Sequence, residues 1–343
     1  MGADEGACAE PSISGGRTAS VATRLGRGSQ GPVTPTLLEP LRTADRATAD
    51  RFFADAPAEA LVAAVTASDD DLLLELIGRE EVRAAAVPGI LRRLEEYADA
   101  DRLAEVSGTV RFDLRRGSRL LESHAIRLDR GAVDLVADRD AAEAADVVLT
   151  TSLLRFVRLV SGERNAALEY LGGGLDVEGD ALLALAVGGI FRVPGHAEAA
   201  VDPTALDPDE VARAVGEAST DHLRRVMAGG FRPVVLEEVF RRLPSFVDER
   251  RAANLDLVVG FRLGGGPGEP DRYVVTLRDG AAAVTDEDEG RRDATIVCDA
   301  HDFLRLATGH LGAVAGVMRG RLGVKGDKAK ALQFASVIRF PTG

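Results

Sequence analysis

Leu322-Gly-Val-Lys-Gly-Asp327, near the end of the chain, repeats an earlier stretch, Leu175-Asp-Val-Glu-Gly-Asp180. Two more stretches repeat in the same way: Phe303-Leu-Arg-Leu-Ala-Thr-Gly309 follows Phe156-Val-Arg-Leu-Val-Ser-Gly162, and Arg339-Phe-Pro341 follows Arg192-Val-Pro194. All three pairs lie 147 residues apart, whereas chance matches would scatter in their spacing. The sequence therefore predicts one structural unit present twice.

The repeat continues upstream with a slightly different spacing. Leu91-Arg-Arg-Leu94 matches Phe240-Arg-Arg-Leu243, and Val110-Arg-Phe-Asp-Leu114 matches Val259-Gly-Phe-Arg-Leu263, each pair 149 residues apart. A two-residue difference in the loop before Asp146 and Asp293 reconciles the two spacings. We accordingly expect four segments: a disordered tail rich in Gly, Ser, Thr and Pro (1–45), copy one (46–194), a linker (195–207) and copy two (208–343).

Each copy shows the same order of helix and strand patterns. Amphipathic helices come first, at roughly 58–78 and 81–97 in copy one and at 208–228 and 232–246 in copy two. Alternating strands are expected next, near 106–115, 120–129 and 132–138, and near 255–263, 271–278 and 281–285. A buried strand then follows Asp146 or Asp293, a helix capped by Ser152 or Asp299, a second helix, a short strand and a closing helix. This order predicts the α+β class, with a mostly antiparallel or mixed sheet of about five strands and helices over one face.

Composition narrows the classes of partner. The chain has 343 residues, 45% hydrophobic and 28% charged, which is typical of globular domains, and its formal net charge is −13. That charge argues against a nucleic-acid partner and against electrostatic docking on an anionic membrane. No run approaches 18 apolar residues and the N-terminus has no apolar signal region, so stable membrane insertion is not expected. Cys8 and Cys298 form no disulfide framework, which favours the cytoplasm. The tail 1–45 is the segment through which a protein partner could dock.

Three motifs recur in a fixed order in both copies. In copy two they are Asp293-Ala-Thr-Ile-Val, the Phe303–Gly309 stretch and Gly320-Arg-Leu-Gly-Val-Lys-Gly-Asp327; copy one carries Asp146-Val-Val-Leu-Thr, Phe156–Gly162 and Gly173-Gly-Leu-Asp-Val-Glu-Gly-Asp180. The set resembles the sterol carrier protein 2 (sterol-transfer) domain family over about 100 residues of each copy. The resemblance implies a sheet with helices over one face, enclosing an apolar cavity for sterols, fatty acids or acyl chains. Copy one departs from the family at Gly174, where a basic residue is frequent.

A lipid site of this kind needs a concave and mainly apolar lining. The helices expected after the fourth strand have an apolar face broader than a sheet contact requires. The candidate lining residues are Leu153, Phe156, Val157, Leu171, Leu182, Leu185 and Ile190 in copy one, and Phe303, Leu306, Val317, Met318, Leu332, Phe334 and Ile338 in copy two. The alternative is that these side chains simply fill a core, as apolar stripes at helical spacing usually do.

The sequence contains no constellation that predicts catalysis, a metal site or a cofactor. Its five histidines are scattered, and none lies four residues from another ligand on a helix face. His301 and His310 flank one expected helix, and we expect both at the surface. Gly172-Gly-Gly174 precedes a strand instead of opening a helix, so it does not fit a phosphate loop.

Other conspicuous stretches have structural explanations. Gly179-Asp180 and Gly326-Asp327 are expected to turn from strand to helix, with the aspartate as N-cap. Gly264-Gly-Gly-Pro-Gly268 is typical of a hairpin turn. The acidic run 286–289 lacks the glycine and glutamate spacing of a calcium loop and is expected to be a solvated turn.

Two functional hypotheses of different classes remain open. The first is non-catalytic cytoplasmic binding, extending to transfer, of a hydrophobic ligand such as a sterol, fatty acid or acyl chain. The second is an interaction or scaffold protein, or the accessory subunit of an enzyme, with a disordered targeting tail and collapsed cavities. Cavity volume discriminates between them, because volumes below about 300 Å³ in both copies would favour the second hypothesis.

Overall fold

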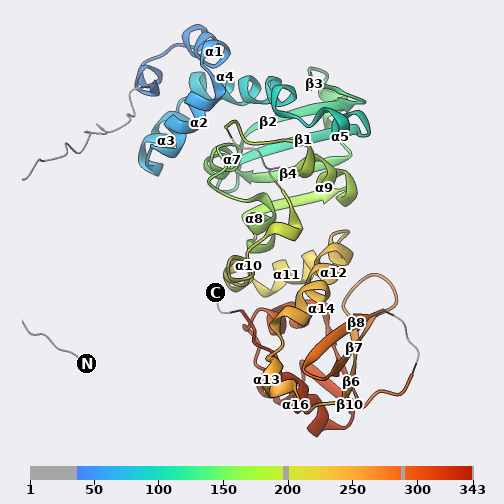
Figure 1. Ribbon diagram of the computed structural model, residues 1–343. Helices are drawn as coiled ribbons and strands as arrows, with labels where there is room; N and C mark the ends of the chain where they lie inside the picture. Colours follow the sequence, from blue (N-terminus) through green and yellow to red (C-terminus); the bar gives the residue numbers. More distant parts are fainter. Residues whose placement is uncertain (1–36, 196–200, 287–289, 342–343) are drawn as a thin grey trace, which may run out of the picture.

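The computed structural model describes residues 37–195, 201–286 and 290–341, and it contains two units that follow one another along the molecule (Figure 1). The first unit contains α1 (Arg46–Asp55), α2 (Ala58–Thr66), α3 (Asp70–Gly78), α4 (Glu80–Arg92), α5 (Ala100–Ala104), β1 (Ser107–Arg116), β2 (Arg119–Asp129), β3 (Ala132–Val136), α6 (Arg139–Glu143), β4 (Val147–Ser152), α7 (Leu153–Val160), α8 (Ala166–Gly172), β5 (Leu175–Gly179) and α9 (Ala181–Ile190). The second contains α10 (Pro208–Glu217), α11 (Thr220–Ala228), α12 (Arg232–Arg242), α13 (Glu249–Ala252), β6 (Leu257–Gly264), β7 (Asp271–Arg278), β8 (Ala281–Thr285), β9 (Ala294–Asp299), α14 (Ala300–Ala307), α15 (Ala313–Met318), β10 (Leu322–Gly326) and α16 (Lys328–Val337).

Both units are built on the same mixed sheet. The strand order is β3-β2-β1-β4-β5 in the first and, read in the same sense, β8-β7-β6-β9-β10 in the second. Among the strands that the structure describes, the pair β1 and β4 and the pair β6 and β9 are parallel and the others are antiparallel. That register places Phe112 beside Leu149 and Phe261 beside Ile296. The predicted α+β class and the duplication are confirmed.

The helices expected at 58–78 and 208–228 are each broken in two, so that part of the prediction was wrong. Asp69 begins α3 by accepting a hydrogen bond from the backbone N–H of Leu72, and Ser219 begins α11 by accepting one from His222. The first backbone N–H groups of a helix have no partner within the helix, and each of these side chains accepts a hydrogen bond from one of them. A new helix can therefore begin in the middle of an apolar run. The continuous apolar periodicity concealed these breaks.

Packed structure begins before residue 45, where the tail was expected to end. Leu38 and Leu41 are buried, and they join a core formed by α1, α3 and α4. Residues 1–36, which include Cys8, lie outside the described residues, so a protein partner for the tail stays a prediction. The run 286–289 lies outside the described part from residue 287 onward.

The two Gly-Asp turns are built alike, as the sequence predicts. Asp180 caps α9 by accepting from the backbone N–H groups of Leu182 and Leu183, and Asp327 caps α16 in the same way. The preceding glycines, Gly179 and Gly326, have φ of 97° and 83°. A Cβ at Gly326 would lie 2.6 Å from the backbone oxygen of Asp293. Glycine is therefore required both for its backbone conformation and for the close approach of β9.

Replacing Gly326 by Ala is expected to lower the free energy of unfolding of the second unit by about 2–4 kcal/mol, since the strain of a positive φ adds to an overpacked contact. Urea unfolding followed by far-UV circular dichroism measures the loss. Gly320→Ala is the matched control, because Gly320 also has positive φ (70°) but nothing lies within 4 Å of its added Cβ. Equal losses in both variants would show that the contact with β9 contributes nothing.

An ion pair fastens the closing segment of each unit to the same place. Arg192 Nη2 lies 2.7 Å from Asp99 Oδ2, and Arg339 Nη2 lies 2.8 Å from Asp248 Oδ2. The pKa of Asp99 is lowered, first by a hydrogen bond from the backbone N–H of Arg102 and then by Arg192. The pKa of Asp248 is lowered chiefly by the hydrogen bond from Arg339.

Acid is expected to weaken both units through these carboxylates. A carboxyl group whose pKa falls on folding stabilises the folded state while it is ionised. The contribution is therefore complete above the unfolded value, near 3.9, and is lost as the pH falls through the lower folded value. Urea midpoints measured from pH 2 to pH 7 should fall at the acid end, and less steeply in Asp99→Asn and Asp248→Asn. Identical acid slopes in these variants and in the unmodified chain would contradict the assignment.

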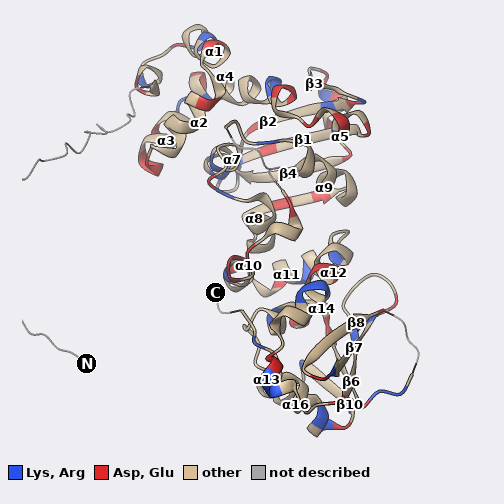
Figure 2. Ribbon diagram, viewed as in Figure 1, with Lys and Arg blue, Asp and Glu red and all other residues tan. Residues whose placement is uncertain are grey.

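The two units meet where α8 of the first packs against α10 of the second (Figure 1). Leu171 at the end of α8 is buried in the core of the second unit. The ring of Tyr170 lies 4.8 Å from that of Phe231, and His222 Nε2 is 2.7 Å from the backbone oxygen of Tyr170. Acidic and basic side chains are interspersed over both units (Figure 2).

Candidate functional site

An apolar cavity of about 440 Å³, here called the copy-two cavity, lies in the second unit and extends to its junction with the first. Phe261 and Ile296 line it from the sheet, Phe303 and Leu306 from α14, and Phe334 from α16. The rings form a connected cluster: Phe261 lies 5.5 Å from Phe303 and 5.9 Å from Phe334. The register of β6 and β9 brings the two sheet residues side by side on the face that the helices cover.

The first unit encloses a second apolar cavity of the same volume, about 440 Å³, here called the copy-one cavity. Phe112 and Leu149 line it from the sheet and Phe156 from α7. The rings of Phe112 and Phe156 lie 5.9 Å apart. Helices α2, α3 and α4 contribute further apolar walls, including Leu61, Ile77 and Ile90.

Helix α7 lines the copy-one cavity and α14 lines the copy-two cavity, each with the same face. Positions 147 residues apart on α7 and α14 recur in the two linings: Phe156 and Phe303, Val157 and Leu304, Leu159 and Leu306, Val160 and Ala307, Ser161 and Thr308. The repeat spacing could have predicted this set, because a face that packs alike in both copies keeps its apolar character at matching positions. Leu159, Val160, Leu304 and Ala307 were missed.

The predicted lining residues are distributed unevenly. Leu153, Phe156 and Val157 line the copy-one cavity; Phe303, Leu306, Val317, Met318, Leu332, Phe334 and Ile338 line the copy-two cavity. Leu171 and Leu185 belong to copy one yet line the copy-two cavity, which extends along the junction of the units. Leu182 is 73% exposed and Ile190 is packed in the core, and neither lines a cavity. Val317 and Met318 lie at an open edge, with Met318 83% exposed.

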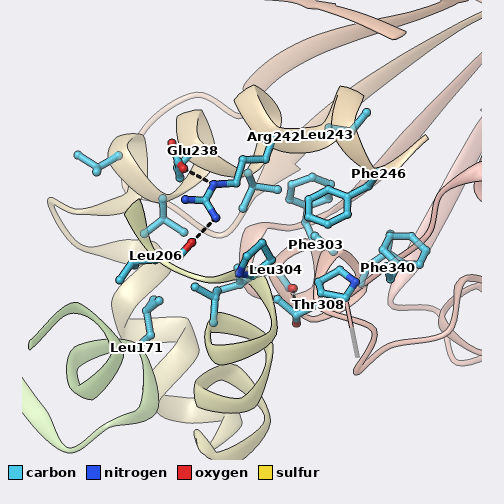
Figure 3. Close-up of a pocket in the computed structure, with 18 of the residues that line it drawn as sticks. Leu171, Leu206, Glu238, Arg242, Leu243, Phe246, Phe303, Leu304, Thr308 and Phe340 are labelled. Atoms are coloured by element: carbon cyan, nitrogen blue, oxygen red, sulfur yellow. Dashed lines mark hydrogen bonds and ion pairs between the residues drawn. The ribbon is translucent and has the colours of Figure 1, made fainter. Parts of the chain in front are cut away.

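Polar groups are few on the copy-two wall, and the most prominent is an ion pair. Arg242 donates to the Glu238 carboxylate and to the backbone oxygen of Leu206 (Figure 3). It also donates to the backbone oxygen of Thr204 at 2.8 Å. Burial alone would raise the pKa of Glu238, but hydrogen bonds from Arg241 and Arg242 outweigh it and lower the pKa. Arg242 is thus occupied in holding the chain segment before α10.

The expected linker, 195–207, contains part of the cavity wall. Among its described residues, Val201, Pro203 and Leu206 line the copy-two cavity, and Arg242 anchors their backbone. The repeat contains the same anchor in copy one, where Arg93 Nη1 donates to the backbone oxygen of Ala56 at 2.7 Å. The segment is therefore a repeated structural part of each unit as well as a connection.

The glycine-rich hairpin of the second unit encloses a buried arginine. Arg232, at the start of α12, donates through Nε to Asp271 at 2.7 Å and through Nη1 and Nη2 to the backbone oxygens of Met227 and Leu263. A Cβ at Gly266 would lie 2.9 Å from the Arg232 guanidinium carbon, which explains the glycine there. Asp299 faces this hairpin, and its side chain accepts no hydrogen bond at the start of α14, so the expected cap was wrong.

Three side chains with the potential for chemistry, His301, Cys298 and Tyr170, have pKa values that burial shifts away from neutral pH. His301 was expected at the surface, but it is 5% exposed, 3.6 Å from Asp302, and burial lowers its pKa. Burial also raises the pKa of the Cys298 thiol to about 12 and that of Tyr170 to about 12. No cluster of three or more potential metal ligands occurs among the residues that the structure describes. No helix in the described ranges has the length and apolar character needed to cross a membrane.

Known proteins match the chain in the repeated unit. The model of the "SCP-2 sterol transfer family" matches residues 89–192 and 236–339, one match in each copy and together more than half of the chain. The chain belongs to this family. The resemblance read from the motifs is confirmed, and the two SCP-2 matches cover both sheets. Helices α2, α3, α10 and α11 lie outside the SCP-2 matches, although α2, α3 and α10 line the cavities.

Three similar proteins each cover about a third of this SCP-2 chain. "Hydroxysteroid dehydrogenase-like protein 2" of Xenopus tropicalis is 27% identical over 104 residues, which are 30% of this chain and 24% of the relative. The chain thus spans about a quarter of that relative's length. Sterol Carrier Protein 2 from Yarrowia lipolytica (apo form) is 22% identical, with 32% of this chain and 94% of that chain covered and a TM-score of 0.26. The sec-alkylsulfatase Pisa1 from Pseudomonas sp. is 15% identical, with 38% and 24% covered and a TM-score of 0.28.

Proposed function

We propose that this chain binds a hydrophobic ligand of the sterol, fatty acid or acyl class in its two cavities, and carries it without chemical change in the cytoplasm. The observation that carries the proposal is the pair of cavities of about 440 Å³, each lined mainly by apolar side chains. This volume lies in the usual range for small-molecule sites, about 300–1,000 Å³. It supports ligand binding over the scaffold alternative, which requires collapsed cavities.

Burial of hydrocarbon supplies the affinity. At about 25 cal/mol per Å² of apolar area, a ligand that buries a few hundred Å² gains several kcal/mol before the entropy cost of binding is subtracted. No directional group is needed for that gain, and the few polar side chains on the copy-two wall are consistent with it. His301 is buried, and burial raises the pKa of the Cys298 thiol to about 12, so neither side chain takes part in the proposed binding.

Two measurements test the proposal together. Protein purified without added lipid is extracted with organic solvent and the extract is analysed by mass spectrometry, which should reveal a co-purified lipid. The protein is then titrated with fluorescent acyl and sterol probes, since the chain has no tryptophan and the probe must carry the signal. Saturable binding of two short acyl probes per chain is the expected result. An empty protein that also ignores every probe would refute the proposal.

A further inference from the structure

The two cavities meet at a common wall. Six residues line both of them: Leu149, Ala166, Leu175, Val187, Gly188 and Val201. They come from β4, the start of α8, β5, α9 and the segment between the units. Residues that face both cavities at once leave no second layer of protein between them at that place. The wall is therefore a partition one side chain thick.

The partition carries no polar side chain. All six residues are apolar, so a hydrocarbon chain that lies across the wall meets no unpaired hydrogen-bonding side chain. The backbone at its edge is already paired, because the N–H of Val201 donates to the backbone oxygen of Gly188 at 3.0 Å. The side chains of Leu149, Leu175, Val187 and Val201 are the aliphatic groups that must move for the wall to open, and rotamer changes of side chains are fast compared with movements of whole elements.

The two copies carry side chains of different size at the partition, and copy one has the smaller ones. Val187 and Gly188 of α9 correspond to Phe334 and Ala335 of α16, 147 residues later. The larger pair occurs in copy two, where no further unit of the described chain lies beyond it. The smaller pair occurs where α9 faces the second cavity. A Cβ at Gly188 would lie 2.8 Å from the Val201 side chain, so no residue larger than glycine fits at this point of the wall without a shift of Val201.

We propose that the two cavities act as one site for a single lipid whose hydrocarbon chain is too long for either cavity, with the chain threaded through the partition at Val187 and Val201. The class of ligand is a long, flexible, single-chain lipid. The inference rests on the proposed function and deepens it: the duplication creates a site of double length as well as two equal sites.

A chain-length series tests this inference. Saturated fatty acids of increasing length are titrated into the full chain, and the number bound per chain is counted by native mass spectrometry. Short acids should bind two per chain and long acids one per chain. The dissociation constant should fall about fourfold for each added methylene, which is the fold-change expected for a buried CH₂, and the fall should continue past the length at which stoichiometry changes.

Val187→Phe places in the partition the residue that copy two has at the matching position. It should weaken the longest acids at least tenfold more than it weakens the short acids, because only the long chains must cross the partition. Far-UV circular dichroism checks separately that the variant folds. Leu182→Phe is the control, because Leu182 is on the same helix and lines neither cavity. Two long acids bound to each unmodified chain, or long-chain affinities that agree within twofold in Val187→Phe and the control, would overturn the inference. Absence of binding at every length would instead contradict the proposed function.

Discussion

Arg232→Met is expected to lower the free energy of unfolding of the second unit by about 3–5 kcal/mol, a large fraction of the stability of an ordinary domain. Arg232 is only 6% exposed and serves one carboxylate and three backbone oxygens from α11 and the β6–β7 hairpin. Met preserves most of the side-chain volume, so the loss would come from the acceptors that remain buried without a donor.

The repeat supplies a matched control for this substitution. Arg83 occupies the same position in copy one, 149 residues earlier, and its Nε lies 2.9 Å from Glu122 Oε1. It serves fewer acceptors than Arg232, with one further hydrogen bond to the backbone oxygen of Ile77, so Arg83→Met should cost less. Urea unfolding followed by circular dichroism measures both. A loss below about 1 kcal/mol in Arg232→Met, the range of an exposed ion pair, would show that water replaces the guanidinium.

Ala307→Trp is expected to abolish binding in the copy-two cavity. Ala307 lines that cavity from α14, and a tryptophan side chain there would occupy the volume that the ligand needs. The stoichiometry of a short acyl probe should fall from two per chain to one, with at least a tenfold loss of affinity at the affected site. Val160→Trp should do the same in copy one, since Val160 is the matching residue on α7 and lines the other cavity.

The control for these variants keeps the added ring away from both cavities. Ala329→Trp places it on the exposed first turn of α16, at a position that lines neither cavity. Each variant also introduces the sole tryptophan of the chain, whose emission reports folding and energy transfer to a bound probe. Two probes bound with unchanged affinity to Ala307→Trp would show that the ligand lies elsewhere.

The features that sequence predicted correctly depend on side chains close along the chain. The caps at Asp180 and Asp327 need only the following N–H groups, and the occurrence of two five-stranded sheets follows from a repeat that is visible in the motifs. The Arg232–Asp271 pair and its counterpart Arg83–Glu122 were missed, although the 149-residue spacing relates all four residues. Both pairs could have been predicted from the sequence, because an arginine and an acidic residue recur at matching positions in the two copies.

Other features depend on how the units pack together, and local patterns do not contain them. Helix α9 is apolar on nearly every side, so periodicity could not separate exposed Leu182 from Leu185, which lines a cavity of the other unit. Leu171 is covered only because α10 of copy two lies against α8. The segment around Leu206 has the composition of a linker, and its role as a wall follows from the Arg242 anchor contributed by a distant helix.

The contact of α8 with α10 is asymmetric, because α8 lies in the first unit and α10 lies in the second. It joins two different faces of one repeated unit, so it is a heterologous pairing of the kind that continues from unit to unit unless rotation closes a ring. In this chain it occurs between the first unit and the second. The positions on α15 that match Tyr170 and Leu171 are Val317 and Met318, and both lie uncovered in the described structure. Met318 thus remains exposed at the position where copy one buries Leu171 against the neighbouring unit.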